Sequence, residues 1–381
     1  MNSPVNSTGS NAMDCKIVVA AIAIVTGCAL FAESAQPQAK VAVYAGAGAG
    51  GVGAVECLRL VQESPELELH LVDARDIQSG ALDGMDMLLM PGGSSDKEYK
   101  ALGAKGVERL DAFLRNGGGY LGLCAGCAVV MDEKSRARMI PWKWSGSVSG
   151  TLFPTIQINE KGAAALGLKA GPVAVRYHGG PFMWPSTNVF EGVNTEAWAI
   201  LDAEVSLKGK IKPKIKMHGS TAIVGGTYGK GRIVVSTVHP EYCVDTLPIV
   251  KGAFKYLLGR EVTFPQRKRS PRALAVGVLA ADISGKEVAE TVLALSAERN
   301  IDVVPVDVAG INLRVLDHVD VFILVSDSNA KNLVLKAGIR DFASRGGKTI
   351  GFGSGVKMLP PGGTTCRDGK ETVSTVKRIA K

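Results

Sequence analysis

A cysteine framed by glycines and a distant histidine–glutamate pair are the residues of this chain best suited to chemistry. The run Gly122-Leu-Cys124-Ala-Gly126 has the form of a nucleophile elbow, in which glycines leave room beside a nucleophile on a strained strand-to-helix turn. Far downstream, a β-branched segment ends in His239-Pro-Glu241, and residues two apart in an extended chain point to the same side. The pattern predicts Cys124 as nucleophile, His239 as its base and Glu241 as the group that orients the imidazole.

A second cysteine nearby leaves alternatives open. A lone cysteine is more often core filler than nucleophile, and Cys124 with Cys127 also has the C-x-x-C spacing of redox proteins. Three interpretations follow: a nucleophile with Cys127 packed in the next helix, a reversible disulfide that protects the thiol, and a thiol oxidoreductase. The flanking glycines favour the first. No second cysteine or histidine pair lies at ligand spacing, so no metal site is expected.

The segments around Cys124 predict helix, turn, strand and helix. Apolar residues at helical spacing indicate a helix that ends near residues 116–117, where asparagine and glycine favour a left-handed cap. Tyr120 to Leu123 then predicts a short buried strand. The thiol is therefore expected at the carboxyl edge of a sheet, beside the N-terminus of the next helix.

The N-terminal part continues this α/β pattern. A strand over residues 40–44 leads into the glycine-rich residues 45–53, and a later buried strand ends in Met90-Pro-Gly-Gly-Ser94. Gly48-x-Gly50-x-x-Gly53 imitates a dinucleotide fingerprint, and Asp73 lies where such a site would need an acidic residue. The other interpretation, favoured because the elbow occupies the same sheet edge, is a plain turn that lines the pocket.

These motifs resemble the class I glutamine amidotransferase-like superfamily, and within it the amidotransferase-like domain at the N-terminus of some biotin–protein ligases. The resemblance covers residues 40–262 and implies a flavodoxin-like, doubly wound parallel sheet. It implies the same triad of Cys124, His239 and Glu241, with the backbone N–H groups of Gly93 and Ala125 as oxyanion donors. Intracellular cysteine peptidases of the superfamily carry histidine directly after the cysteine, so Ala125 disfavours that branch.

The resemblance also implies residues that contact the substrate. Relatives carry a Tyr-x-Gly-Gly-like segment near the pocket, which in this chain points to Tyr177, His178 and Gly180. Gly92, in the loop that carries the oxyanion donor, joins them. The simpler interpretation of residues 176–181 is a turn after a strand.

The C-terminal third repeats the first half of this pattern without its nucleophile. Residues 342–355 align with the stretch around the elbow, so that Cys124 falls on Gly353, and the predicted oxyanion loop becomes Ser326-Asp-Ser328. We therefore expect a basic linker over 263–272 and a smaller, degenerate amidotransferase-like α/β domain over 273–381. Chance similarity among glycine-rich segments is the alternative.

The first 36 residues predict a targeting segment. Lys16 precedes the apolar run Ile17 to Ile24, which has signal-peptide length, and Val-Thr-Gly-Cys28 matches a bacterial lipobox. A lipidated Cys28, ordinary secretory cleavage and a retained anchor are the three interpretations. Each exports the protein to the periplasm or cell envelope, with membrane attachment only through a lipid at Cys28 or the retained segment.

The net charge and the absence of certain motifs argue against several classes of function. The net charge of +8 is mild for 381 residues and no recognition motif accompanies it, so nucleic acid is not an expected partner. No cofactor is expected, and the absence of a Walker A run or a biotin-adenylation motif argues against ligase activity. The main hypothesis is an exported thiol hydrolase acting on a small-molecule amide through a thioester. The alternative is a non-catalytic small-molecule-binding protein on the same fold.

Overall fold

The computed structural model describes residues 37–203, 217–264, 273–280, 283–327 and 330–381. The predicted targeting segment with Cys28, the lysine-rich stretch 208–216 and most of the predicted linker lie outside these residues. In the described part of the chain, no helix combines the length and apolar character needed to span a bilayer. Residues Pro37–Lys381 form one compact unit, so the expected boundary between two domains stays a prediction.

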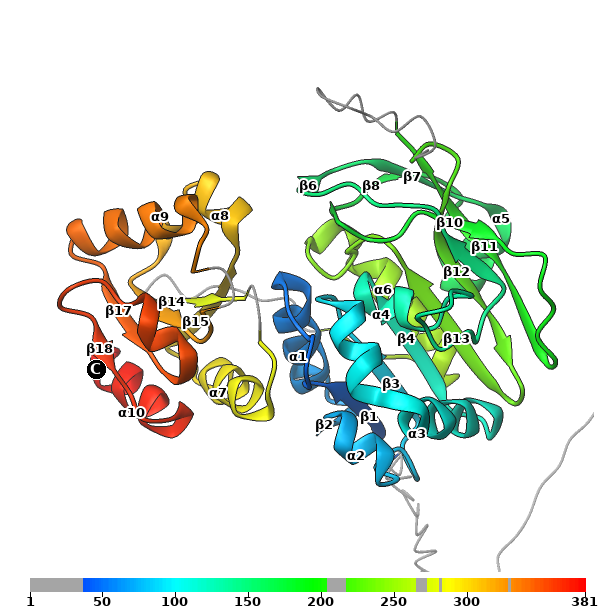
Figure 1. The fold of residues 1–381 in the computed structure, drawn as a ribbon, viewed down its shortest axis with the longest axis horizontal. Helices are drawn as coiled ribbons and strands as arrows, with labels where there is room; N and C mark the ends of the chain where they lie inside the picture. Colours follow the sequence, from blue (N-terminus) through cyan, green and yellow to red (C-terminus); the bar gives the residue numbers. More distant parts are fainter. Residues whose placement is uncertain (1–36, 204–216, 265–272, 281–282, 328–329) are drawn as a thin grey trace, which may run out of the picture. The chain divides into compact units, whose positions relative to one another are not determined.

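The larger of the two main sheets has eleven strands, five of them parallel neighbours that build the expected α/β core (Figure 1). The parallel part has the order β2-β1-β3-β4-β13, formed by Leu67–Val72, Ala39–Tyr44, Met87–Met90, Gly119–Leu123 and Gly231–Ser236.

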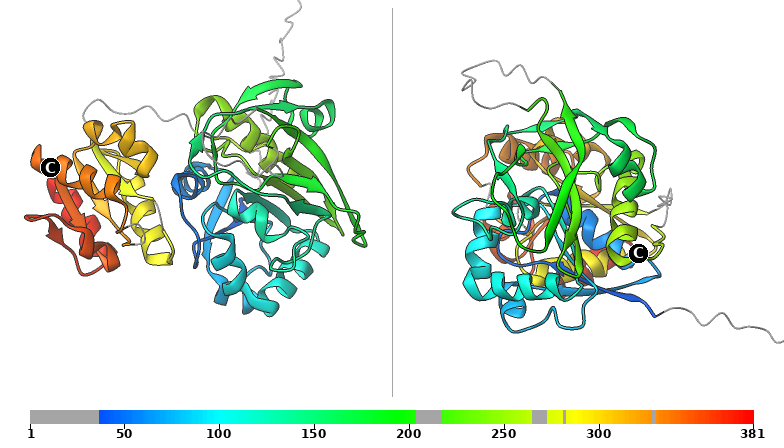
Figure 2. Two further views of the ribbon diagram at one scale, coloured as in Figure 1. Left: turned by 45° about the horizontal axis from the view of Figure 1, so that its top comes forward. Right: turned by 90° about the vertical axis from the view of Figure 1, so that its right-hand side faces the viewer.

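An antiparallel extension continues this sheet beyond β13 through the long strands β12 and β11 (Figure 2). It contains β12 (Thr221–Tyr228), β11 (Val193–Asp202), β7 (Thr155–Ile158), β8 (Gly171–Ala174), β10 (Met183–Pro185) and β5 (Trp142–Trp144). A separate pair of short strands, β6 (Thr151–Leu152) and β9 (Tyr177–His178), is antiparallel.

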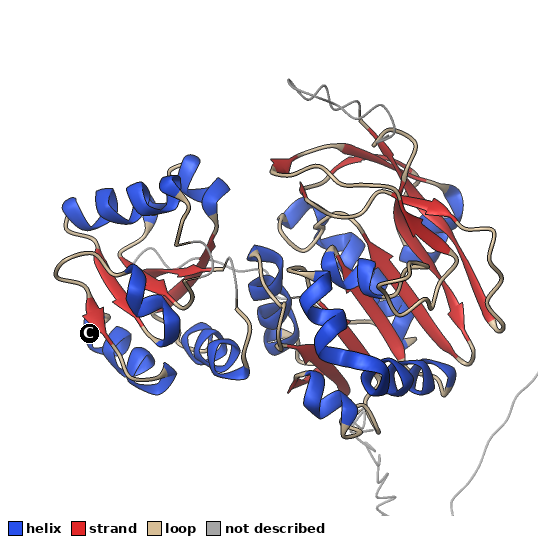
Figure 3. Cartoon of the chain, in the orientation of Figure 1, coloured by secondary structure: helices blue, strands red, loops and turns tan. Residues whose placement is uncertain are grey.

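Helices cover both faces of the parallel strands, as Figure 3 shows. Alternate residues of β1 serve the two layers, because Val41 and Val43 pack in one core cluster and Ala42 and Tyr44 in the other. The first cluster includes α1 (Val52–Glu63) and α6 (Leu247–Leu258), which α5 (Glu160–Leu166) contacts; the second includes α2 (Ala74–Gln78), α3 (Ser95–Arg115) and α4 (Ala125–Val129). The flavodoxin-like, doubly wound fold is thereby confirmed.

The second main sheet repeats the order of the first. Its five parallel strands run β15-β14-β16-β17-β18, the same 2-1-3-4-5 sequence, and Figure 1 shows helices on both of its faces. The strands are Ile301–Val306, Leu274–Leu279, Val321–Leu324, Lys348–Gly351 and Thr364–Thr365, and the helices are α7 (Lys286–Ser296), α8 (Val308–Asn312), α9 (Leu333–Ser344) and α10 (Gly369–Ile379). Short 3-10 turns η1 (Val244–Thr246), η2 (Val315–His318) and η3 (Gly353–Met358) complete the described elements.

The repeat extends to the turn that would carry a nucleophile. Cys124 has a φ of +52° and Gly353, its counterpart, has a φ of +56°. A Cβ atom at Gly126 would lie 2.2 Å from the carbonyl oxygen of Met90, and one at Gly355 would lie 1.9 Å from that of Leu324. Both glycines thus let a helix start against the end of the neighbouring strand. The second sheet keeps the backbone of the elbow and lacks its thiol.

We predict that Gly355→Ala lowers the free energy of unfolding by about 3 kcal/mol, because the new methyl group would overlap a backbone oxygen that cannot move aside. Urea unfolding followed by circular dichroism measures this change. Gly362→Ala is the matched control, since Gly362 has a φ of +82° but no atom within 4 Å of the position that a methyl group would take. It should cost about 1 kcal/mol through backbone strain alone. Equal losses in the two variants would contradict a role for the close approach at Gly355.

Candidate active site

Cys124 lies where the parallel strand β4 meets the short helix α4. Its amide N–H donates to the carbonyl oxygen of Ser236 at 2.7 Å, which ties the turn to the end of β13. The left-handed backbone of Cys124 is unusual for a residue with a side chain and indicates strain at this position. Only 7% of Cys124 is exposed, so the thiol is accessible at the bottom of a cavity and not on an open surface.

His239 and Glu241 form a buried hydrogen bond beyond the end of β13. The distance from His239 Nδ1 to Glu241 Oε1 is 2.7 Å, and the two residues are 5% and 2% exposed. Burial by itself would lower the pKa of His239, but the Glu241 carboxylate and then the Cys124 sulfur raise this pKa to about 10. The imidazole is therefore positively charged at neutral pH, with Glu241 as its partner.

The first turn of α1 fits closely against this pair. A Cβ atom at Gly53 would lie 1.9 Å from Glu241 Oε1 and 3.0 Å from His239 Nδ1. Only glycine lets the helix approach so closely. The third glycine of the fingerprint-like motif is thus explained by packing against the histidine–glutamate pair.

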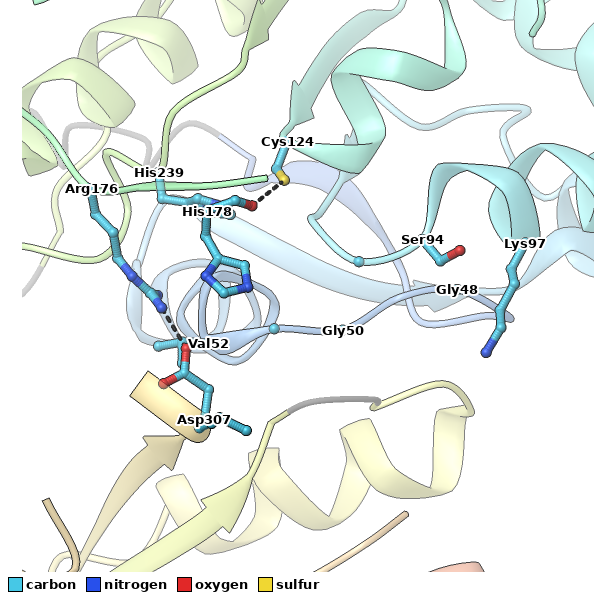
Figure 4. Close-up of a pocket in the computed structure, with 13 residues that line it drawn as sticks. Gly48, Gly50, Val52, Ser94, Lys97, Cys124, Arg176, His178, His239 and Asp307 are labelled. Carbon is cyan, nitrogen blue, oxygen red and sulfur yellow. Dashed lines mark hydrogen bonds and ion pairs between the residues drawn. The ribbon is translucent and has the colours of Figure 1, made fainter. Parts of the chain in front are cut away.

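The side chains of Cys124 and His239 both lie next to Gly92. The position of a Cβ atom at Gly92 lies 3.2 Å from His239 Cε1 and 3.4 Å from Cys124 Cβ, so the two side chains are neighbours. The proximity of Cys124 is one of the causes that raise the pKa of His239. The thiol donates to the carbonyl oxygen of His178 at 3.5 Å, as Figure 4 shows, and His239 Nε2 is buried without a partner.

The two predicted oxyanion donors flank this site. The N–H groups of Gly50 and Ser94 donate to the carbonyl oxygens of Gly92 and Gly48 and so form the bridge between Ala49 and Gly93. The N–H group of Gly93 takes no part in these two hydrogen bonds. Ala125 is the first residue of α4, and the N–H groups at the start of a helix have no partner within it. The oxyanion role of these two amides stays a prediction.

A cavity of about 270 Å³ opens above Cys124 and His239 (Figure 4). The glycine-rich loop between β1 and α1 forms one wall, and Lys97, Arg176 and His178 contribute polar side chains. Arg176 Nη2 lies 2.5 Å from Asp307 Oδ2, and the guanidinium also stacks on the ring of Tyr242. Burial first, and then the charge of Arg176, lowers the pKa of His178. The cavity can thus hold a small polar molecule beside the thiol.

The residues that the resemblance implicates in substrate contact do not all reach this cavity. His178 lines it, whereas Tyr177 is fully buried and donates its hydroxyl hydrogen to the carbonyl oxygen of Gly180 at 2.7 Å. A Cβ atom at Gly180 would lie 2.0 Å from the backbone oxygen of Thr237. Tyr177 and Gly180 therefore hold the loop that presents His178, and the structure gives them no place in the cavity wall.

Two alternatives for the motifs find little support in the packing. Cys127 is fully buried, its thiol contacts Met183 Sδ at 3.2 Å, and burial holds the pKa of this thiol well above its usual range. Cys124 and Cys127 are both free thiols in this structure. Asp73, which a nucleotide site would use for the ribose, caps α2 instead by accepting from the N–H groups of Arg75 and Asp76.

Several polar residues of the site were not predicted from the sequence: Lys97, Arg176 and Asp307 in the cavity wall, and Glu98. Arg176 lines the cavity, although nothing in its sequence context distinguishes it from a surface arginine. Glu98 is fully buried in the first turn of α3, and neither carboxylate oxygen has a hydrogen-bond partner. Burial, followed by the nearby Cys124 sulfur, holds the pKa of Glu98 well above its usual range. A glutamate in the first turn of a helix is ordinarily interpreted as a solvent-exposed cap residue.

We predict that Gly53→Ala slows alkylation of Cys124 by iodoacetamide about a hundredfold, because the methyl group would displace Glu241 and with it His239. Mass spectrometry of the labelled peptide measures the rate. Gly51→Ala is the matched control: Gly51 has a φ of +83° and open space around it, so that change strains the loop without touching Glu241. Equal reaction rates in the two variants would rule out this effect of packing.

We also predict that His239 loses its second ring proton only near pH 10, and that Glu241→Gln moves this titration to lower pH because a neutral amide does not stabilise the imidazolium. Because the pKa is raised above its unfolded value, the pair stabilises the fold fully below about pH 6.5 and ceases to do so as the pH rises through about 10. The ¹⁵N chemical shifts of the ring report the titration. Glu196→Gln, at the surface, should leave it unchanged; an unshifted curve in Glu241→Gln would refute the assignment.

Residues 39–131 match the family described as biotin-protein ligase, N terminal. The segment includes the glycine-rich loop, the predicted oxyanion loop and Cys124, and it ends before His239. The curated biotin–protein ligase of Schizosaccharomyces pombe (strain 972 / ATCC 24843) is 25% identical over 241 residues, which cover 55% of this chain and 34% of that protein. The chain thus spans about a third of the length of this relative.

Solved structures resemble this chain at low identity. A ThuA-like protein from Bacteroides uniformis ATCC 8492 is 12% identical with a TM-score of 0.44, over 59% of this chain and 93% of that one. The cold-adapted β-galactosidase from Rahnella sp. R3 is 16% identical with a TM-score of 0.39, over 57% of this chain and 31% of that one. Scores this low support no statement about function. The resemblance to the N-terminal family of biotin–protein ligases is confirmed for residues 39–131.

Proposed function

We propose that this chain is an exported cysteine amidohydrolase that cleaves a small amide through a thioester. The observation that carries the proposal is the buried His239–Glu241 hydrogen bond next to a strained cysteine at the bottom of a cavity. Serine and cysteine hydrolases use this combination of nucleophile, base and orienting carboxylate. Biotin–protein ligase activity belongs to the curated relative and is not proposed for this chain, which has no adenylation motif.

In the first half-reaction the Cys124 sulfur attacks the amide carbonyl carbon. Because His239 is already protonated at neutral pH, the Cys124 sulfur attacks as the thiolate of an ion pair whose imidazolium Glu241 stabilises. The carbonyl oxygen becomes an oxyanion near the Gly93 and Ala125 amides. The carbon–nitrogen bond then breaks, and His239 gives its Nε2 proton to the departing nitrogen. Ammonia or an amine leaves, and the acyl group remains on sulfur as a thioester.

In the second half-reaction water attacks the thioester carbon. His239 accepts a proton from that water, the same amides stabilise the second oxyanion, and the carbon–sulfur bond breaks. The sulfur leaves as a thiolate and the proton stays on His239, so the starting ion pair is restored as the carboxylic acid leaves. The unpartnered Nε2 of His239 is the atom this scheme needs, and a rotation of the thiol away from the His178 carbonyl would bring the two together.

A non-catalytic binding protein is the second candidate, and one observation favours it. The Cys124 thiol donates to a backbone carbonyl in this structure instead of to His239. In that case the cavity would bind a small polar molecule without turnover. Export rests on the N-terminal segment alone, with Cys28 as the proposed site of lipidation.

We predict that iodoacetamide labels Cys124 rapidly at neutral pH and that His239→Ala slows this labelling about a hundredfold, the usual contribution of a general base. Cys243→Ser serves as the matched control, because Cys243 is the other partly exposed free thiol among the described residues. Ammonia release from glutamine and small primary amides should accompany rapid labelling and vanish in Cys124→Ala. Slow labelling at a rate that His239→Ala leaves unchanged would favour the binding protein.

A further inference from the structure

A second cavity lies behind the histidine–glutamate pair. Its volume is about 380 Å³, and it opens between α1 and the segment that runs from Glu241 into α6. His239 lines the catalytic cavity, whereas Glu241 lines this one. The hydrogen bond between the two residues therefore connects two separate cavities.

Glu241 has an unused oxygen on a fully buried side chain. Oε1 accepts from His239, and Oε2 has no hydrogen-bond partner although the side chain is 0% exposed. A buried carboxylate oxygen without a partner is costly, and a native structure rarely leaves one without a reason. Glu241 also lines the second cavity, so the charge of its carboxylate acts on an ion bound there.

The wall of the second cavity has more acidic than basic side chains. Glu56 and Glu63 of α1 join Glu241, and Arg59 is the one basic residue of the wall. Arg59 Nη1 is 3.0 Å from Glu56 Oε1, and its Nε is 4.0 Å from Glu63 Oε1. Burial, opposed by the charge of Arg59 and assisted by the charges of Glu241 and Asp302, raises the pKa of Glu56 to about 7. Near neutral pH the cavity thus holds a proton that a cation could replace.

The remaining wall is apolar. Leu60, Leu247 and Phe264 line it, and Val244, which is 74% exposed, stands at its rim. No three histidine, cysteine or acidic side chains in the described part of the chain converge closely enough to hold a metal ion. Carboxylates on one side and aliphatic and aromatic groups on the other suit an organic cation.

We propose that the second cavity binds a primary ammonium ion carried on an apolar body, with Glu241 and Glu56 as its counter-ions. Binding does not depend on the proposed hydrolysis; only its effect on catalysis does. A positive charge beside Glu241 would weaken the attraction that keeps the second proton on His239. By linkage, the ligand would lower the pKa of His239, and protonation of His239 would weaken the ligand.

The test uses the reduced full chain and benzylamine, titrated calorimetrically at mildly alkaline pH, where Glu56 is ionised and the amine is still protonated. Benzyl alcohol is the uncharged probe of similar shape and should bind about tenfold more weakly or not at all. Glu56→Gln should weaken benzylamine about tenfold. Glu108→Gln, which removes the same charge from the exposed face of α3, should change nothing.

Two further variants protect the test against misfolding and against failure of the proposed hydrolysis. Val244→Lys places a tethered ammonium at the rim, on a side chain exposed enough to tolerate the change, and should also weaken benzylamine. Cys124→Ser should bind benzylamine like the wild type, whether or not the wild type hydrolyses amides. Equal affinity for the amine and the alcohol, or benzylamine binding that both Glu56→Gln and Val244→Lys leave unchanged, would overturn the proposal.

Discussion

The buried hydrogen bond between His239 and Glu241 constrains the structure on three sides. The start of α1 approaches it so closely that position 53 has no room for a side chain, which fixes the glycine-rich turn after β1. On the second side, Gly92 lies next to both the imidazole and Cys124. On the third side Glu241 lines the acidic cavity between α1 and α6. Moving this pair would disturb the nucleophile, the loop and the second cavity together.

The two sheets differ in the residue at the tip of the elbow and therefore in the backbone strain at that point. Both bend the chain into the left-handed region at the same point, and the second does so with glycine, which adopts that conformation without strain. The first places a cysteine there, at a cost of about 1–3 kcal/mol. This strained thiol beside a charged imidazole is the basis of the proposed chemistry. Cys127, three residues on, has the opposite character: buried, relaxed and in contact with Met183.

Much of the fold could be predicted because its signals are local. Glycine spacing indicated the elbow, β-branched runs indicated the parallel strands, and the repeated pattern around Gly353 indicated a second sheet of the same order. Predictions that relied on a short segment alone fared less well. Tyr177 precedes His178 in the chain, yet only His178 lines the cavity, because an extended segment turns neighbouring side chains to opposite sides. Gly180 follows the turn at Gly179 and packs against the backbone of Thr237.

The sequence alone determined which residue types could react and which backbone each needs: a thiol between glycines, and a histidine and glutamate two apart at the end of a strand. Only the tertiary structure decided which other side chains join them. Arg176, Glu98 and Glu56 are ordinary charged residues in the sequence. Arg176 and Glu98 are buried and Glu56 is half-buried in the fold, and the packing of segments distant along the chain gives them their character. Local pattern fixes backbone conformation, whereas the environment of a charge depends on contacts between residues far apart, which no spacing rule records.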